Sequence, residues 1–131
     1  MHLHHKVDLC LDTFPYTGGT TTMHALWMGV PTLTIPGNTL PGRVTACALS
    51  HMELGAFIAR DTDDFVAKGT YIANDPALLA NIRSNLRHLI ENSAMGRSEV
   101  IAAGLEGALR VMWQRWCEGK AAAGFEIELD P

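Results

Sequence analysis

The sequence has little of what marks nucleic-acid-binding, membrane-spanning or disulfide-stapled proteins. Ten Lys and Arg oppose fourteen Asp and Glu, a formal charge of −4, so no nucleic-acid partner is expected. No stretch reaches the roughly 18 apolar residues of a membrane helix, so no membrane partner is expected either. Three cysteines, Cys10, Cys47 and Cys117, lie far apart without a C-x-x-C pair, which predicts neither disulfides nor a zinc site and fits a reducing cytoplasm.

The histidines and serines also fail to form the patterns that metal sites and hydrolases require. His2, His4 and His5 are crowded at the start of the chain, but their spacing matches neither a helical pair nor a zinc finger. The chain has no Ser-His-Asp order and no G-x-S-x-G elbow, which leaves hydrolase chemistry without its residues. We therefore predict no metal and no cofactor.

The length of 131 residues fits one domain, residues 1–131, with enough chain for a core. Its first predicted strand begins directly after the histidine-rich start, which is abrupt for a natural domain. We therefore expect the chain to be the C-terminal piece of a longer protein.

A strand, a helix and a second strand are predicted in the first third of the chain. Residues 7–12 form a short apolar run, which is typical of a central parallel strand covered on both faces. Residues 20–28 have apolar side chains at helical spacing, and Gly29 suits the C-terminal end of that helix. The β-branched run at residues 32–35 predicts the second strand.

The rest of the chain is predicted to be mainly helical. Asp61 and the Asp75-Pro76 pair are typical helix starts, and Ser98 is a third candidate cap. Apolar side chains then recur on one face of each segment. The predicted helices are residues 43–52, 61–73, 75–90 and 98–116, and residues 56–59 are a candidate third strand.

Strands that alternate with helices predict an α/β fold, a partial Rossmann-like parallel sheet with flanking helices and long C-terminal helices. About three strands are visible, against the ~6 of a full doubly wound sheet. Such a partial sheet has an open edge, which favours a homodimer of the chain. Trp113 and Trp116, at helical spacing, are expected in the core or at an interface rather than as a sugar platform.

The stretch from residue 12 to residue 31 organises these predictions. Gly18 and Gly19 follow the first strand and would let the backbone approach a ligand, because glycine has no Cβ. Thr20 and Thr21 then open the helix, where unpaired N–H groups and the helix dipole favour a phosphate. The ordinary alternative is a loop and helix cap without a ligand. Asp12, without a nearby carboxylate partner, is expected to brace the loop rather than to act as a base.

The run from residue 7 to residue 44, VDLCLDTFPYTGGTTTMHALWMGVPTLTIPGNTLPGRV, resembles the catalytic region of the O-linked N-acetylglucosamine transferase family, including its SPINDLY-like members. It is also similar to bacterial N-glucosyltransferases. The resemblance implies an inverting, metal-independent glycosyltransferase of the B-type fold, often preceded by tetratricopeptide repeats. This chain would be the latter half of the C-terminal Rossmann-like domain, which holds the nucleotide diphosphate.

The resemblance assigns roles to particular residues. The family's phosphate-contacting threonine pair falls on Thr20 and Thr21, beside Gly18 and Gly19, and its acidic ribose-binding residue falls on His24. An imidazole offers one acceptor and one donor where a carboxylate accepts twice, so ribose binding through His24 is a departure from the family. The residues usually discussed as the catalytic base lie outside this chain, so no catalytic residue is assigned.

The resemblance implies transfer of a sugar to Ser or Thr of an acceptor protein, with UDP-N-acetylglucosamine or another nucleotide sugar as the donor. The chain alone is expected to be inactive, because the acceptor half of the cleft is missing. Two alternatives remain open at this point. One is a degenerate nucleotide-binding module, which the substitution at His24 favours, and the other is an oligomerisation module built on the last two helices.

Overall fold

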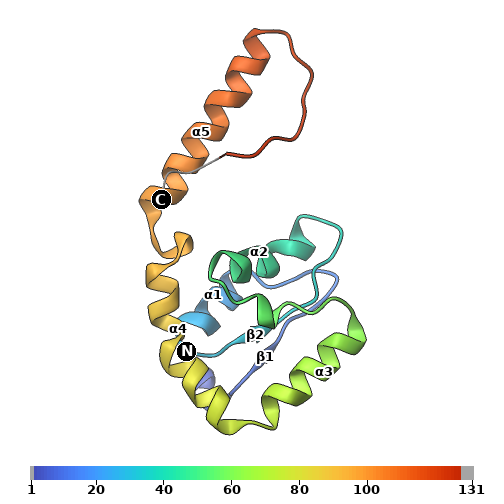
Figure 1. Cartoon of the computed structure of the whole chain (residues 1–131), viewed down its shortest axis with the longest axis vertical. Coiled ribbons are helices and arrows are strands. Elements are labelled where there is room, and N and C mark those ends of the chain that lie inside the picture. Colours follow the sequence, from blue (N-terminus) through green and yellow to red (C-terminus); the bar gives the residue numbers. More distant parts are fainter. Residues whose placement is uncertain (1, 128–131) are drawn as a thin grey trace.

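The computed structural model describes residues 2–127, which form a layered α/β body from which a long C-terminal helix projects (Figure 1). The strands are β1 (Cys10–Leu11) and β2 (Thr32–Leu33). The α-helices are α1 (Thr20–Trp27), α2 (Val44–His51), α3 (Thr62–Ala73), α4 (Pro76–Asn92) and α5 (Ser98–Cys117). Short 3-10 helices occupy His2–Lys6, Pro41–Arg43, Gly55–Phe57 and Ala94–Gly96.

The two strands pair in parallel, with Cys10 opposite Thr32 and Leu11 opposite Leu33. The Cys10 N–H donates to the Pro31 carbonyl and the Asp12 N–H to the Leu33 carbonyl, both at 2.9 Å. A parallel sheet joined through a helix is the core of an α/β fold. The predicted fold class is therefore confirmed.

The strands are shorter than predicted, and the third is wrong as a strand. Residues 7–12 and 32–35 were expected to be extended, but only two residues of each are paired as a strand. Of residues 56–59, Ala56 and Phe57 belong to a 3-10 turn, after which one parallel bridge joins Thr34 to Ile58. The first strand was expected to be covered on both faces. Leu11 is 61% exposed, so one face of β1 is open among the described residues.

Helices lie on both faces of β2. Successive side chains of a strand point to opposite faces, so Thr32 and Leu33 have different neighbours. Thr32 borders a cavity together with Thr21 and Ala25 of α1. Leu33 points the other way, towards α3, where a Cβ on Gly69 would lie 3.4 Å from the Leu33 side chain. Helix α3 therefore packs against the sheet at Gly69.

The hydrophobic core lies between α1, α2 and α4. Leu26, Leu49 and Leu86 are fully buried, and each comes from a different one of these helices. Arg87 of α4 fixes the end of α1, since its guanidinium donates to the Trp27 carbonyl at 3.2 Å and stacks 5.0 Å from the centre of the Trp27 ring. Helix α4 therefore helps to hold the body around β1 and β2 together, since it contacts both α1 and α3.

The predicted helix starts are confirmed at two of three positions. Asp61 accepts from the Asp64 N–H at 2.8 Å, and Asp75 accepts from the Leu78 N–H at 2.9 Å. Ser98 is instead the first helical residue of α5, and the N-cap residue is Arg97, without a side-chain cap. Gly29 follows α1 with φ of +78°, the left-handed conformation expected at a helix end.

Helix α5 leaves the body, and the chain after it runs back alongside the helix (Figure 1). A Cβ on Gly107 would lie 3.4 Å from Ile127, and Arg115 donates to the Ala121 carbonyl at 2.8 Å. Trp113 and Trp116 are 66% and 77% exposed, so neither lies in the core of the described residues. Among the described helices, none is long and apolar enough to cross a membrane.

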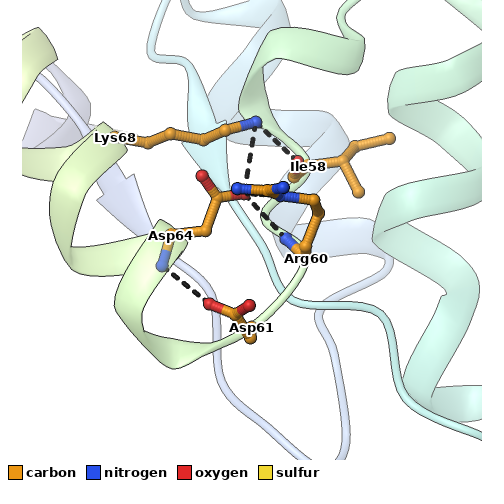
Figure 2. A network of polar contacts seen from close by, with 5 residues as sticks. All are labelled: Ile58, Arg60, Asp61, Asp64 and Lys68. Atoms are coloured by element: carbon orange, nitrogen blue, oxygen red, sulfur yellow. Dashed lines mark hydrogen bonds and ion pairs between the residues drawn. The ribbon is translucent and has the colours of Figure 1, made fainter.

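Asp64 anchors the first turn of α3 to the segment before it (Figure 2). Its carboxylate accepts from the Arg60 N–H at 2.9 Å and pairs with the Arg60 guanidinium at 3.3 Å, while the Lys68 ammonium lies 3.8 Å away. These contacts, the Arg60 N–H first among them, hold the pKa of Asp64 below its ordinary value.

A carboxylate whose pKa is lowered by folding stabilises the protein above its unfolded pKa, about 3.9, and this stabilisation is lost as the pH falls through the folded value. We expect Asp64→Asn to flatten the decline in unfolding free energy below about pH 4, measured by urea unfolding across that range. Asp63→Asn, which removes the same charge from the same turn, is the control. Equal acid sensitivity in wild type and Asp64→Asn would contradict this interpretation.

Candidate functional site

The glycine turn, residues 13–19, connects the carboxyl end of β1 to the first residue of α1. Gly19 is the N-cap residue, and no side chain caps this helix. The first N–H groups of any α-helix lack an intrahelical acceptor. In α1 these donors are therefore left without the carboxylate that caps α3 and α4.

Side chains hold both peptide groups that flank Gly18. Its N–H donates to Asp12 Oδ1 at 2.8 Å, and its carbonyl accepts from the Thr45 hydroxyl at 2.8 Å. The space is also tight, because a Cβ on Gly18 would lie 2.4 Å from Thr22 Oγ1 and 3.3 Å from Asp12 Oδ1. Gly18 is thus required by close packing, and its own N–H is already used within the protein.

Asp12 connects the turn to both strands. Besides Gly18, its Oδ1 accepts from the Thr13 N–H at 3.0 Å, and its Oδ2 accepts from the Thr34 hydroxyl at 2.7 Å. Thr34 lies directly after β2 and is fully buried. The expectation that Asp12 braces the following loop is confirmed.

Two buried threonines that were not identified from the sequence as site residues, Thr17 and Thr45, support the other side of the turn. Thr45, 1% exposed, lies 3.2 Å from Thr22 through their hydroxyl oxygens. Thr17 is also buried, and its hydroxyl donates to the Pro41 carbonyl at 2.7 Å. The signal in the sequence was weak, since it consists only of polar residues in apolar surroundings, where buried hydroxyls require partners.

Two cavities flank the glycine turn. The larger, about 750 Å³, is bordered by Gly18 and Gly19 and by apolar side chains that include Val44, Ala48 and Met95. This volume lies within the roughly 300–1,000 Å³ range of small-molecule sites. Arg43, at the start of α2, also borders this cavity and supplies a positive charge. The arrangement can therefore accommodate an anionic ligand with an apolar part.

The smaller cavity, about 240 Å³, lies between α1 and the sheet. It is bordered by His4, Cys10, Asp12 and Thr21, among others. Burial raises the pKa of the Cys10 thiol above its ordinary value. Because the thiolate is the nucleophilic form of cysteine, this thiol is not activated for covalent chemistry.

The structure brings four of the five predicted site residues together at the beginning of α1. Gly18, Gly19 and Thr21 border the flanking cavities, and Thr20 is exposed beside them on the first turn. His24 is exposed one turn further along α1 and is not among the residues that border either cavity. A ligand on the first turn of α1 would reach His24 along the outer surface of the helix.

We expect Gly18→Ala to lower the free energy of unfolding by about 1–3 kcal/mol, the usual cost of overpacking a tight site. Urea unfolding measures the difference. Gly55→Ala is the matched control, because a Cβ there meets nothing within 4 Å, and a change of no more than about 0.5 kcal/mol is expected. Equal effects of the two substitutions would show that the packing around Gly18 is not restrictive.

Comparison with known proteins identifies relatives over nearly the whole chain. The profile of Glycosyl transferase family 41 matches residues 3–104. A SPINDLY protein of Hordeum vulgare, named as a UDP-N-acetylglucosamine–peptide N-acetylglucosaminyltransferase, is 36% identical over 98% of this chain and 14% of its own length. An N-acetylglucosaminyltransferase of Caenorhabditis elegans is 30% identical over 86% of this chain and 10% of its own length.

A solved structure agrees with these sequence relatives. A mutant O-GlcNAc transferase of Thermobaculum terrenum matches with a TM-score of 0.81 and 33% identity, covering 92% of this chain and 23% of that one. This chain thus spans about a seventh of the Hordeum vulgare relative, 14% of its length. The resemblance stated from residues 7–44 is confirmed, and the chain belongs to glycosyl transferase family 41.

Proposed function

We propose that this chain is part of a protein glycosyltransferase that transfers N-acetylglucosamine from UDP-N-acetylglucosamine to Ser or Thr of an acceptor protein. The glycine turn and the first turn of α1 would hold the donor diphosphate. The observation that carries the proposal is the open start of α1, where Gly19 supplies no cap beside a cavity of about 750 Å³. The relatives' names give the donor and the acceptor class.

The chemistry would be stabilisation of the leaving group. As the bond between sugar and diphosphate breaks, negative charge grows on the outer phosphate. N–H groups of the first turn of α1 and the hydroxyls of Thr20 and Thr21 are preorganised donors for that charge. The resemblance implies an inverting reaction that needs no metal, and this donor set is of the kind such a reaction would use.

His24 would make the ribose contact in a modified form. It is exposed on α1, one turn beyond Thr20 and Thr21. A neutral imidazole can accept one hydrogen bond from a ribose hydroxyl and donate another, whereas a carboxylate accepts from both hydroxyls. We infer that the ribose contact of the donor here differs from the contact in family members that have an acidic residue at the position of His24.

A second function, assembly of subunits, is favoured by the exposed apolar face of α5. Leu105, Leu109, Met112, Trp113 and Trp116 are all more than half exposed. Apolar surface of this size commonly marks an interaction site. This function is compatible with donor binding, because α5 projects away from the glycine turn (Figure 1).

We expect the double substitution Thr20→Ala, Thr21→Ala in the full-length glycosyltransferase to lower kcat strongly. Losing one preorganised donor typically lowers kcat by roughly 10²–10³, about 2.7–4 kcal/mol. Transfer of radiolabelled N-acetylglucosamine to acceptor protein measures the effect. The 131-residue chain alone is expected to show no transfer.

Thr70→Ala is the control, since Thr70 is exposed on α3 and borders neither cavity beside the turn, and its turnover should equal that of wild type. Unchanged turnover in the double variant would refute the diphosphate assignment. Sugar transfer by the isolated chain would refute the proposal that the chain supplies only part of the active site.

A further inference from the structure

We propose that Asp12 is a positioning residue for donor binding: it fixes the glycine turn in the conformation that leaves the first-turn amides of α1 open to phosphate. The inference rests on the proposed function for its ligand, and on the hydrogen bonds of Asp12 for its mechanism. It assigns Asp12 neither contact with substrate nor acid–base chemistry.

The carboxylate of Asp12 accepts three hydrogen bonds. Asp12 Oδ1 accepts from the Gly18 N–H at 2.8 Å and the Thr13 N–H at 3.0 Å, so it closes the turn at both ends. Oδ2 accepts from the buried Thr34 hydroxyl at 2.7 Å, which attaches the turn to β2. Three of about four lone-pair positions are then occupied, which leaves little capacity for a general base.

The Gly18 carbonyl is also hydrogen-bonded within the protein. It accepts from the Thr45 hydroxyl at 2.8 Å, and Thr45 is 1% exposed in α2. Asp12 and Thr45 thus hold the two peptide groups that flank Gly18: Asp12 holds the one before it, and Thr45 holds the one after it, which carries the Gly19 N–H. The orientation of the N–H groups at the start of α1, from Gly19 onwards, is therefore fixed by these hydrogen bonds.

The negative charge of Asp12 also bears on ligand binding. A carboxylate beside a phosphate-binding turn repels the ligand, and this repulsion is stronger where water is partly excluded. Its presence there is therefore explained by what it does to the turn rather than by contact with the ligand. It follows that a variant with an uncharged side chain of the same hydrogen-bonding shape at position 12 should bind the anion as tightly as wild type, or more tightly.

Asp12→Asn and Asp12→Ala separate shape from charge. An asparagine oxygen can still accept from the Gly18 N–H, and its amide can donate to the Thr34 hydroxyl, whereas alanine removes both bonds. We expect Asp12→Asn to bind UDP at least as tightly as wild type and Asp12→Ala to bind it about tenfold more weakly or worse, as for a lost bond to a charged group. Isothermal titration of the 131-residue chain measures both.

A second pair of variants tests the hydrogen bond between Thr45 and the Gly18 carbonyl. Thr45→Ser keeps the hydroxyl that the Gly18 carbonyl requires, and Thr45→Val removes it at similar volume. We expect the serine variant to bind UDP like wild type and the valine variant to bind it more weakly. If Thr45→Val and Thr45→Ser bound UDP equally, the two-sided support of Gly18 would be refuted.

Amide hydrogen exchange of Gly18 provides a readout that does not depend on the ligand. Exchange is compared with that of Leu86, which is buried in the middle of α4 and reports global unfolding. The Gly18 amide should be protected in wild type and in Asp12→Asn, and should exchange faster in Asp12→Ala while Leu86 does not change. Unaltered Gly18 exchange in Asp12→Ala would overturn the positioning role even if UDP affinity fell.

The outcomes also separate this inference from the proposed function. If wild type bound neither UDP nor inorganic pyrophosphate, the donor site itself would be refuted, and the exchange data would then decide whether Asp12 fixes the turn. If wild type bound UDP and Asp12→Asn bound it as weakly as Asp12→Ala, with Gly18 still protected, the negative charge would matter rather than the hydrogen bonds. That result would overturn the inference while leaving the donor site in place.

Discussion

The hydrogen bond from the Gly18 N–H to Asp12 Oδ1, 2.8 Å long, is the interaction on which the site depends. It joins the end of β1 to the start of α1, and Thr34 extends the same connection to β2. On the other side, Thr45 holds the Gly18 carbonyl and so joins α2 to the turn. A two-residue strand pair would otherwise give little order to the loop above it, and these side chains compensate for the short sheet.

The start of α1 differs in kind from the starts of α3 and α4. Asp61 and Asp75 cap those helices through their carboxylates, which accept hydrogen bonds from first-turn N–H groups and so stabilise the helix ends. At α1 the acidic residue is instead drawn back to Gly18, and the N-cap position is a glycine. The positive end of that helix dipole remains available to an anion, which is the property that the proposed diphosphate site requires.

Local signals predicted the structure well where the cause is local. The Asp75-Pro76 start, the Asp61 cap and the end of α1 at Gly29 depend on neighbouring residues and were readable from the sequence. Strand lengths were not, because pairing depends on which segments lie alongside. The family resemblance placed the candidate site at Gly18–Thr21, whereas the support by Thr45 is a contact across 27 positions that no spacing rule indicates.

The central claim, that the start of α1 binds the donor diphosphate, is tested most directly by titrating the ¹⁵N-labelled chain with UDP and following its amide resonances. The account predicts saturable shifts that are largest for the N–H groups of Gly19, Thr20 and Thr21, with uridine causing much smaller ones. It would be contradicted if UDP caused no saturable shift, or if the largest shifts lay on α5 or elsewhere away from the glycine turn.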